Sequence, residues 1–142
     1  MDNVITIVSG LPRSGTSMMM QILESGGMKI VTDNIRKANE DNPYGYYEYE
    51  KVKEIKEDTG WLKETRGKAF KMVSQLLYDL PSDENFKVIF MKRKMNEILA
   101  SQSKMLERMG SRKDGTSDVK MGEFFNKHLL KVIDWMESRK YI

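Results

Sequence analysis

Residues 4–17 read Val-Ile-Thr-Ile-Val-Ser-Gly-Leu-Pro-Arg-Ser-Gly-Thr-Ser. The apolar run 4–8 predicts a strand that is covered on both faces, as in a parallel sheet. Gly10 and Gly15 bracket the loop that follows, and a helix is predicted over about 15–24. Because the N–H groups of such a loop and of the helix N-terminus point toward one small anion, the stretch predicts a phosphate-binding loop at a strand end.

This loop differs from the Walker A loop of metal-dependent nucleoside triphosphatases. The two glycines have the Walker spacing, but Thr16 stands where that loop has lysine, and the basic residue is Arg13. A second apolar strand, predicted over 86–91, ends in Lys-Arg-Lys, whereas a metal-bound triphosphate requires a carboxylate there. Three cations favour a second phosphate bound without magnesium. Since parallel sheets bind ligands at the carboxyl ends of their strands, we expect a ligand with two separated phosphates.

The rest of the chain predicts further strands and helices. They are a short strand over 28–31 and helices over 48–58, 66–78, 95–109 and 118–137, with a turn at 42–45 and a loop over 110–117. The helix over 66–78 rests on a stripe of apolar residues at helical spacing, Phe70, Val73, Leu76 and Leu77. This order of elements predicts an α/β fold around a mostly parallel sheet.

Two of the predicted helices have faces that we expect to be buried. The first helix is expected to bury Met18, Met19, Ile22 and Leu23. The last helix has a longer apolar stripe, made of Met121, Phe124, Phe125, His128, Leu129, Val132, Ile133 and Met136. This stripe is expected to pack in the core or to form a homodimer contact through the last helix.

Length and composition narrow the class of protein. The 142 residues are enough for a single domain, 1–142, and the net charge of +3 is too small to indicate a nucleic-acid partner. The chain has no cysteine, and His128 is its only histidine, so thiolate and histidine-rich metal sites are excluded. No apolar run approaches the roughly 20 residues of a membrane span, and the N-terminus does not resemble a signal peptide. We therefore expect a cytoplasmic protein that does not bind membranes.

Several segments, in the right order along the chain, resemble one enzyme family. Residues 10–17 resemble the 5′-phosphosulfate loop, Pro-Lys/Arg-Ser-Gly-Thr-Ser/Thr, of sulfotransferases that use 3′-phosphoadenosine-5′-phosphosulfate (PAPS). Arg93 and Ser101 have the eight-residue spacing of that family's 3′-phosphate site. Residues 42–48, Asn-Pro-Tyr-Gly-Tyr-Tyr-Glu, resemble a segment of many bacterial sulfotransferase-like proteins, and residues 128–135 resemble their late helix.

The resemblance implies a fold and a reaction. The fold would be a three-layer P-loop-type domain, with a mostly parallel sheet flanked by helices, in a small or truncated version because the family's domains are typically longer. The family pattern Arg-Asn-Pro after the second strand is Arg93-Lys94-Met95 here. The reaction would transfer a sulfuryl group from PAPS to a hydroxyl or amine of a small-molecule or glycan acceptor. The product nucleotide would be adenosine 3′,5′-bisphosphate, and no metal would take part.

The resemblance also implies a role for individual residues. Arg13 would act catalytically by neutralising the bridging oxygen and the leaving 5′-phosphate. The 5′-phosphate would be held by the loop residues Pro12, Arg13, Ser14, Gly15, Thr16 and Ser17. Arg93 and Ser101 would hold the 3′-phosphate and so select PAPS over ATP. Glu48 is the candidate general base for the acceptor's proton.

Alternative interpretations remain open for the site and for the whole chain. Glu48 also fits a charge at a helix N-terminus, and His128 fits a packed, hydrogen-bonded core histidine better than a catalytic base. The tyrosines at 44, 46, 47 and 49 fit an acceptor pocket or the packing of a loop on the sheet. The chain also fits a non-catalytic relative that binds a phosphorylated nucleotide or a protein partner. A small P-loop kinase or triphosphatase fits less well, because Thr16 replaces the lysine.

Overall fold

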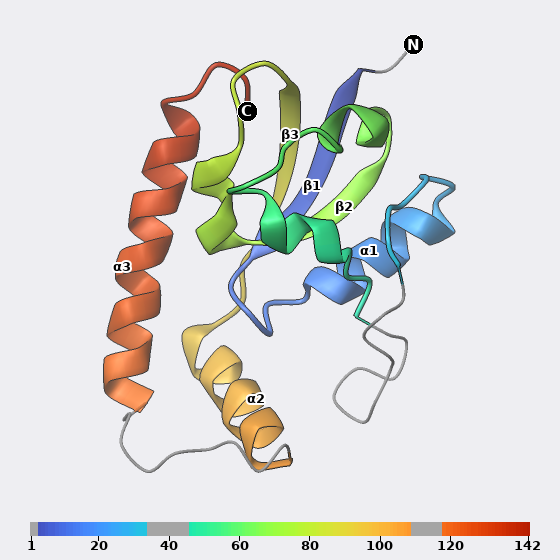
Figure 1. Cartoon of the computed structure of the whole chain (residues 1–142). Coiled ribbons are helices and arrows are strands. Elements are labelled where there is room, and N and C mark those ends of the chain that lie inside the picture. Colours follow the sequence, from blue (N-terminus) through green and yellow to red (C-terminus); the bar gives the residue numbers. More distant parts are fainter. Residues whose placement is uncertain (1–2, 34–45, 109–117) are drawn as a thin grey trace.

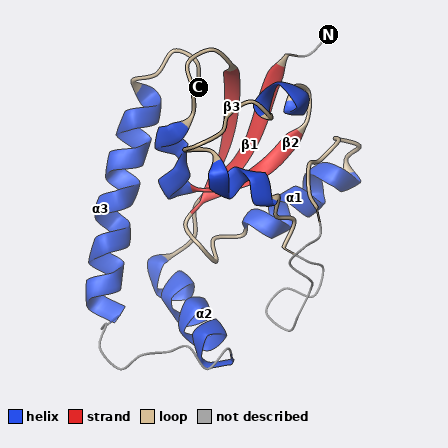
Figure 2. Ribbon diagram, viewed as in Figure 1, coloured by secondary structure: helices blue, strands red, loops and turns tan. Residues whose placement is uncertain are grey.

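A three-stranded parallel sheet forms the centre of the computed structural model, which describes residues 3–33, 46–108 and 118–142 (Figures 1 and 2). The strands are β1 (Val4–Gly10), β2 (Ala69–Val73) and β3 (Asn85–Met91), in the order β2-β1-β3. The central strand β1 is the apolar run predicted as a doubly covered strand, and its residues 5–10 are all buried. The predicted α/β fold with a parallel sheet is therefore confirmed for the part of the chain described.

The alternation of side chains along the strands separates two faces of the sheet. Ile5 and Ile7 of β1 join Phe70 and Met72 of β2 in one core cluster, which also contains Val132 of the last helix. On the opposite face, Lys71 of β2 reaches the first helix, where its Nζ donates a hydrogen bond to the Oγ of Ser17 at 2.9 Å. Helices thus pack on the sheet around a core whose largest members are fully buried.

Three α-helices and three short 3-10 helices flank the sheet in the described residues. The α-helices are α1 (Thr16–Ser25), α2 (Met95–Arg108) and α3 (Asp118–Glu137), and the 3-10 helices are η1 (Glu50–Glu54), η2 (Leu62–Thr65) and η3 (Ser74–Asp79). Helix α1 contacts β1 and β2, while α3 packs against η3 and α2 (Figure 1). These three α-helices lie within a few residues of their predicted ranges.

The predicted helix over 66–78 is wrong, because the segment forms β2 and then η3. Besides the apolar stripe that predicted a helix, the segment contains an alternating pattern in which Phe70 and Met72 are buried and Lys71 and Val73 are less so. Pairing with β1, in the register Ile7↔Phe70, satisfies the backbone of this segment as a strand. A tertiary contact that the local pattern does not contain therefore decides between the two periodicities.

Smaller corrections concern three other segments. The strand predicted over 28–31 is a single bridge between Ile30 and Ala69, and the helix predicted over 48–58 contains only η1 and turns. In the first helix Met20 is buried, whereas Met18 and Ile22 are more than half exposed. The prediction that Met18 and Ile22 are buried is therefore wrong, because the buried side of the helix is centred on Met20. The turn predicted at 42–45 and the loop predicted over 110–117 lie outside the described residues.

The environment of His128 matches the interpretation as a packed histidine. Its Nε2 lies 2.6 Å from the Oγ of the buried Ser74, and its ring meets the ring of Tyr78 edge-on. The α3 stripe buries Phe125 and Val132, but Phe124 is 60% exposed, which corrects its expected burial. A homodimer contact through α3 stays a prediction. Among the described residues, no helix combines the length and the apolar character that crossing a bilayer requires.

We expect the stability of the fold to fall when His128 becomes protonated. Burial lowers the pKa of His128 below its ordinary value of 6.5. The unfolded chain therefore binds more protons than the folded protein as the pH falls through this range, and the free energy of unfolding decreases. Urea unfolding at pH of about 7.5 and about 5.5 measures this decrease. The variant His128→Gln keeps a hydrogen-bonding group, and its decrease should be smaller; an equal decrease in both proteins would contradict the assignment.

Candidate anion-binding site

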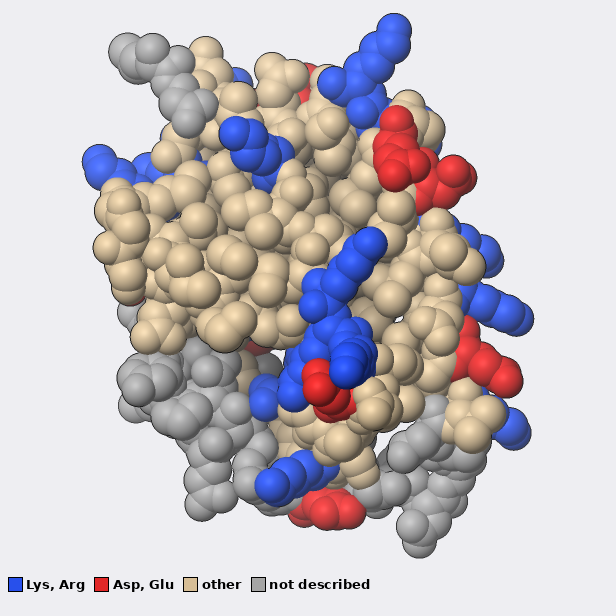
Figure 3. All heavy atoms as spheres, turned by 180° about the vertical axis from the view of Figure 1, so that it is seen from behind, with Lys and Arg blue, Asp and Glu red and all other residues tan. Residues whose placement is uncertain are grey.

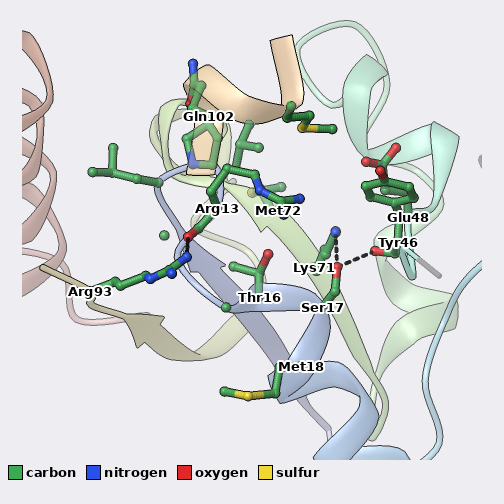
Figure 4. A pocket seen from close by; sticks show the side chains of 16 residues that line it. Arg13, Thr16, Ser17, Met18, Tyr46, Glu48, Lys71, Met72, Arg93 and Gln102 are labelled. Carbon is green, nitrogen blue, oxygen red and sulfur yellow. Dashed lines mark hydrogen bonds between the residues drawn. The ribbon is translucent and has the colours of Figure 1, made fainter. Parts of the chain in front are cut away.

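A cavity of about 510 Å³ lies where the three strands end. One wall is the loop after β1 with the first turn of α1, and β2 contributes Lys71, Met72 and Val73. Arg93 follows β3, and the remaining lining residues are Tyr46, Glu48, Gln102 and Met105 (Figure 4). This volume is within the range of pockets that bind nucleotide-sized ligands.

The loop 10–15 has three residues with positive φ angles and is closed by hydrogen bonds within the loop. Gly10, Arg13 and Gly15 have φ angles of 153°, 63° and 102°, which lie in the region that disfavours residues with a side chain. The Oγ of the buried Ser14 donates a 2.6 Å hydrogen bond to the carbonyl of Leu11, and its N–H also reaches that carbonyl. These two hydrogen bonds connect Ser14 back to Leu11 and so restrain the shape of the loop.

The N-terminus of α1 presents unused backbone donors to the cavity. Its N-cap residue, Gly15, has no side-chain hydrogen bond, and the first turn contains no acidic residue. Within the described part of the chain, no carbonyl accepts a hydrogen bond from the N–H groups of Thr16, Ser17 or Met18. These donors and the positive end of the helix dipole favour an anion at this position.

Arg13 and Arg93 lie next to each other, although 80 residues separate them. The Nη1 of Arg93 donates a hydrogen bond to the carbonyl oxygen of Arg13 at 2.9 Å (Figure 4). The Nε of Arg93 also lies 3.4 Å from the Oε2 of Glu97. The Nε of Arg13 donates a 3.0 Å hydrogen bond to the Oγ of Ser101 in α2. Ser101 thus orients Arg13, whereas the sequence pattern paired it with Arg93.

Lys71 is a functional candidate that the sequence analysis missed. Its Nζ donates to Ser17 at 2.9 Å and lies 5.8 Å from the centre of the Tyr46 ring. Ser17 in turn donates to the carbonyl of Tyr46 at 3.1 Å. The sequence analysis did not identify Lys71 because it placed the residue in a predicted helix. The alternation of apolar Phe70, charged Lys71 and apolar Met72 is the sequence signal for a strand in which Lys71 faces away from the core.

Tyr46 and Glu48 close the cavity on the side of Lys71. Tyr46 is buried, and the Glu48 side chain is 17% exposed and lies 3.5 Å from Lys53. Between them Tyr47 has a φ of 56°, a sharp turn of the backbone that brings two neighbouring side chains to the same wall. Tyr49 packs away from the cavity, edge-on against Trp61, and Tyr44 lies outside the described residues.

Most of the predicted site residues meet at this cavity. It is lined by Pro12, Arg13, Gly15, Thr16, Ser17, Glu48 and Arg93. Ser14 and Ser101 are not among its lining residues: Ser14 is buried in the loop, and Ser101 acts through Arg13. Gln102 of α2 also lines the cavity, and its buried Oε1 has no hydrogen-bond partner among the described residues.

The charges around the cavity are mainly positive. Lys and Arg side chains gather near the middle of the face seen in Figure 3, over the region where β3 passes into α2, around a small acidic group. The residues that follow β3 are Lys92, Arg93 and Lys94. The described residues contain no group of three histidine, cysteine, aspartate or glutamate side chains arranged to hold a metal ion. The lining cations Arg13, Lys71 and Arg93 can bind an anionic ligand directly.

Comparison of the chain with family models, with curated proteins and with solved structures finds no match.

We expect Gly10→Ala to disrupt the loop. A Cβ on Gly10 would lie 2.6 Å from the Oγ of Ser14 and 2.9 Å from the carbonyl oxygen of Met91, at a φ of +153°. Gly27→Ala is the matched control, since Gly27 also has a positive φ, +95°, but a Cβ there meets nothing within 4 Å. Backbone strain should cost the control about 1 kcal/mol, and the added clash should bring Gly10→Ala to about 2–4 kcal/mol. Equal urea midpoints for the two variants would contradict this account.

Proposed function

We propose that this cavity binds PAPS without a metal ion and that the protein transfers the sulfuryl group to a hydroxyl or amine acceptor. The proposal rests on one observation: Arg13 from the loop after β1, Lys71 from β2 and Arg93 from the segment after β3 line one cavity next to a helix N-terminus without a side-chain cap. In this proposal the chain is a small member of the sulfotransferase class, with the three-layer P-loop-type arrangement of that family.

The two ends of the nucleotide have distinct candidate binding groups. The amides at the start of α1 and the hydroxyl of Thr16 suit the 5′-phosphate, whereas the hydroxyl proton of Ser17 is donated to the Tyr46 carbonyl. Arg93 suits the 3′-phosphate, because its guanidinium lines the same cavity and is fixed to the loop through the Arg13 carbonyl. Ser101 contributes indirectly by orienting the Arg13 side chain.

The reaction requires charge stabilisation more than covalent chemistry. The acceptor oxygen or nitrogen attacks sulfur in line, and negative charge grows on the oxygen that remains with the 5′-phosphate. Arg13 and Lys71 line this cavity and are the cations we assign to that oxygen, and Lys71 is held beside the first turn of α1 by Ser17. Glu48, at the same wall as Lys71, accepts the proton of the acceptor.

The same geometry argues against a magnesium-dependent triphosphatase. The strand-end residues that line the cavity, Lys71 and Arg93, are cations, where a metal-bound triphosphate requires a carboxylate. Thr16 also takes the position of the lysine that holds the β- and γ-phosphates in that class.

We expect the protein to bind adenosine 3′,5′-bisphosphate with micromolar affinity, in the presence or absence of magnesium. Arg13→Glu and Arg93→Glu should each weaken binding at least 100-fold, because each replaces a charge-assisted hydrogen bond with repulsion. Lys63→Glu makes the same charge change at an exposed position outside the cavity and should weaken binding less than about threefold. Calorimetric titration measures all four proteins, with ATP and magnesium as the competing ligand. Unchanged binding by both arginine variants would rule out the proposed site.

We expect Lys71→Met to lower turnover more than nucleotide binding. The methionine keeps the length of the side chain but removes the positive charge next to Ser17. Loss of one charge-stabilising group typically lowers kcat by about 10²–10³-fold. The measurement is the release of adenosine 3′,5′-bisphosphate from PAPS, with calorimetry of the bisphosphate as the binding control. If the bisphosphate binds and PAPS is never consumed by the unmodified protein, the non-catalytic alternative is favoured.

A further inference from the structure

A groove of about 690 Å³ lies beside β3 and is separate from the anion-binding cavity. Most of its lining residues fall within 85–92 and 133–142, so it lies between β3, the end of α3 and the segment that follows α3. None of its lining residues also lines the anion-binding cavity. What binds in this groove is therefore a question independent of the proposed function.

The edge of β3 beside the groove presents backbone groups that another strand can use. In the described part of the chain, β3 pairs with one strand, β1. The N–H of Phe86 points away from β1, because it donates a 2.7 Å hydrogen bond to the carbonyl of Tyr141, near the C-terminus beside β3 (Figure 1). Backbone directions repeat every second residue, so the N–H and C=O groups of Val88 and Phe90 point the same way. The edge thus continues past Tyr141.

The side chains along this edge are apolar and within reach of a ligand. Val88 and Phe90 of β3 line the groove together with Ile133 and Met136 of α3, and all four are half-buried. Covering apolar surface of this kind is favourable in proportion to the area removed from water. An extended segment can cover it while pairing with the backbone of β3.

The charges around the groove favour an acidic occupant. Lys87, Lys92 and Lys140 line it and are exposed, and Glu137 is the one acidic residue among its described lining residues. Lysines at a strand edge disfavour pairing with another basic edge, because like charges would come together. A second copy of β3 is therefore a poor occupant, whereas a partner that carries carboxylates is a good one.

We propose that this groove binds an extended acidic segment of a partner protein, which adds a strand to the edge of β3. The pleat of the sheet specifies the pattern of that segment. Its side chains on the face of Val88 and Phe90 meet apolar groups and are apolar, whereas those on the opposite face, beside Lys87, are acidic. The partner segment therefore alternates apolar residues with aspartate or glutamate.

The probe for this proposal is a fluorescein-labelled peptide, Val-Glu-Val-Glu-Val-Glu-Val, which has the same 7 residues in length as β3. Its binding to the full chain is followed by fluorescence polarisation. We expect saturable binding with a dissociation constant below about 1 mM. A copy with lysine in place of each glutamate should bind at least about tenfold more weakly, because it is repelled by the lysines of the groove.

A pair of matched variants tests the position of the site. Lys87→Glu places a carboxylate beside the acidic residues of the probe and should weaken its binding at least about tenfold. Lys131→Glu makes the same charge change at an exposed position of α3 that does not line the groove. It should weaken binding less than about threefold.

Two N-methylated copies of the probe test the backbone pairing without changing the protein. The N–H groups of a strand alternate between its two edges, so methylation at the valines and methylation at the glutamates block opposite edges. Only one of these edges can face β3. We expect one methylated copy to bind at least about tenfold more weakly than the other.

Four results would overturn the proposal. They are the absence of saturable binding by the acidic probe, equal affinities of the acidic and basic probes, equal effects of the two lysine variants, and equal affinities of the two methylated copies. Sedimentation of the protein with and without the acidic probe tests the remaining occupant. A dimer that the probe dissociates would show that a second copy fills the groove, and would overturn the proposal as well.

Discussion

The parallel pairing of β1 with both of its neighbours is the constraint on which the rest of the structure depends. Gly10, the last residue of β1, is opposite Val73 on one side and Met91 on the other. The segments that leave these three positions therefore emerge at the same edge of the sheet. The loop can turn there because Gly10 lacks a side chain, since a Cβ would press against the Met91 carbonyl at 2.9 Å. A single missing methyl group thus allows three strand ends to form one site.

Bringing three cations to this edge requires specific contacts that oppose their mutual repulsion. Arg93 is held by the carbonyl of Arg13 and by Glu97, while Lys71 is held by the Oγ of Ser17. The Arg13 side chain is held by Ser101. Among the acceptors in these bonds, only Glu97 is a charged side chain. Because oxygens of the protein itself orient these donors, anion binding requires little further ordering of side chains.

The sequence predicts the parts of this site that local patterns specify. The run 4–8 and the glycine spacing of the loop predict β1 and the anion cradle, and an apolar run predicts β3 with its terminal Arg93. The segment 66–78 was mistaken for a helix because its strand exists only through pairing with β1. Because Lys71 lies in this segment, it was not predicted as a site residue. The positions of Tyr46 and Glu48 depend on the left-handed turn at Tyr47, a conformation that a tyrosine does not signal in sequence.

The end of β2 explains why charge and apolar surface occur together in the cavity. Along a strand, neighbouring side chains point to opposite faces, so Lys71 faces α1 while Met72 faces the core. A cavity over either face would receive only one of them. This cavity lies across the strand end, and it is lined by both. The separation between Lys71 and the apolar side chains of Met72 and Val73 is then set by the strand backbone, which is anchored in the core by Phe70. The position of the Lys71 charge relative to the apolar side chains of Met72 and Val73 therefore depends on the backbone of the sheet.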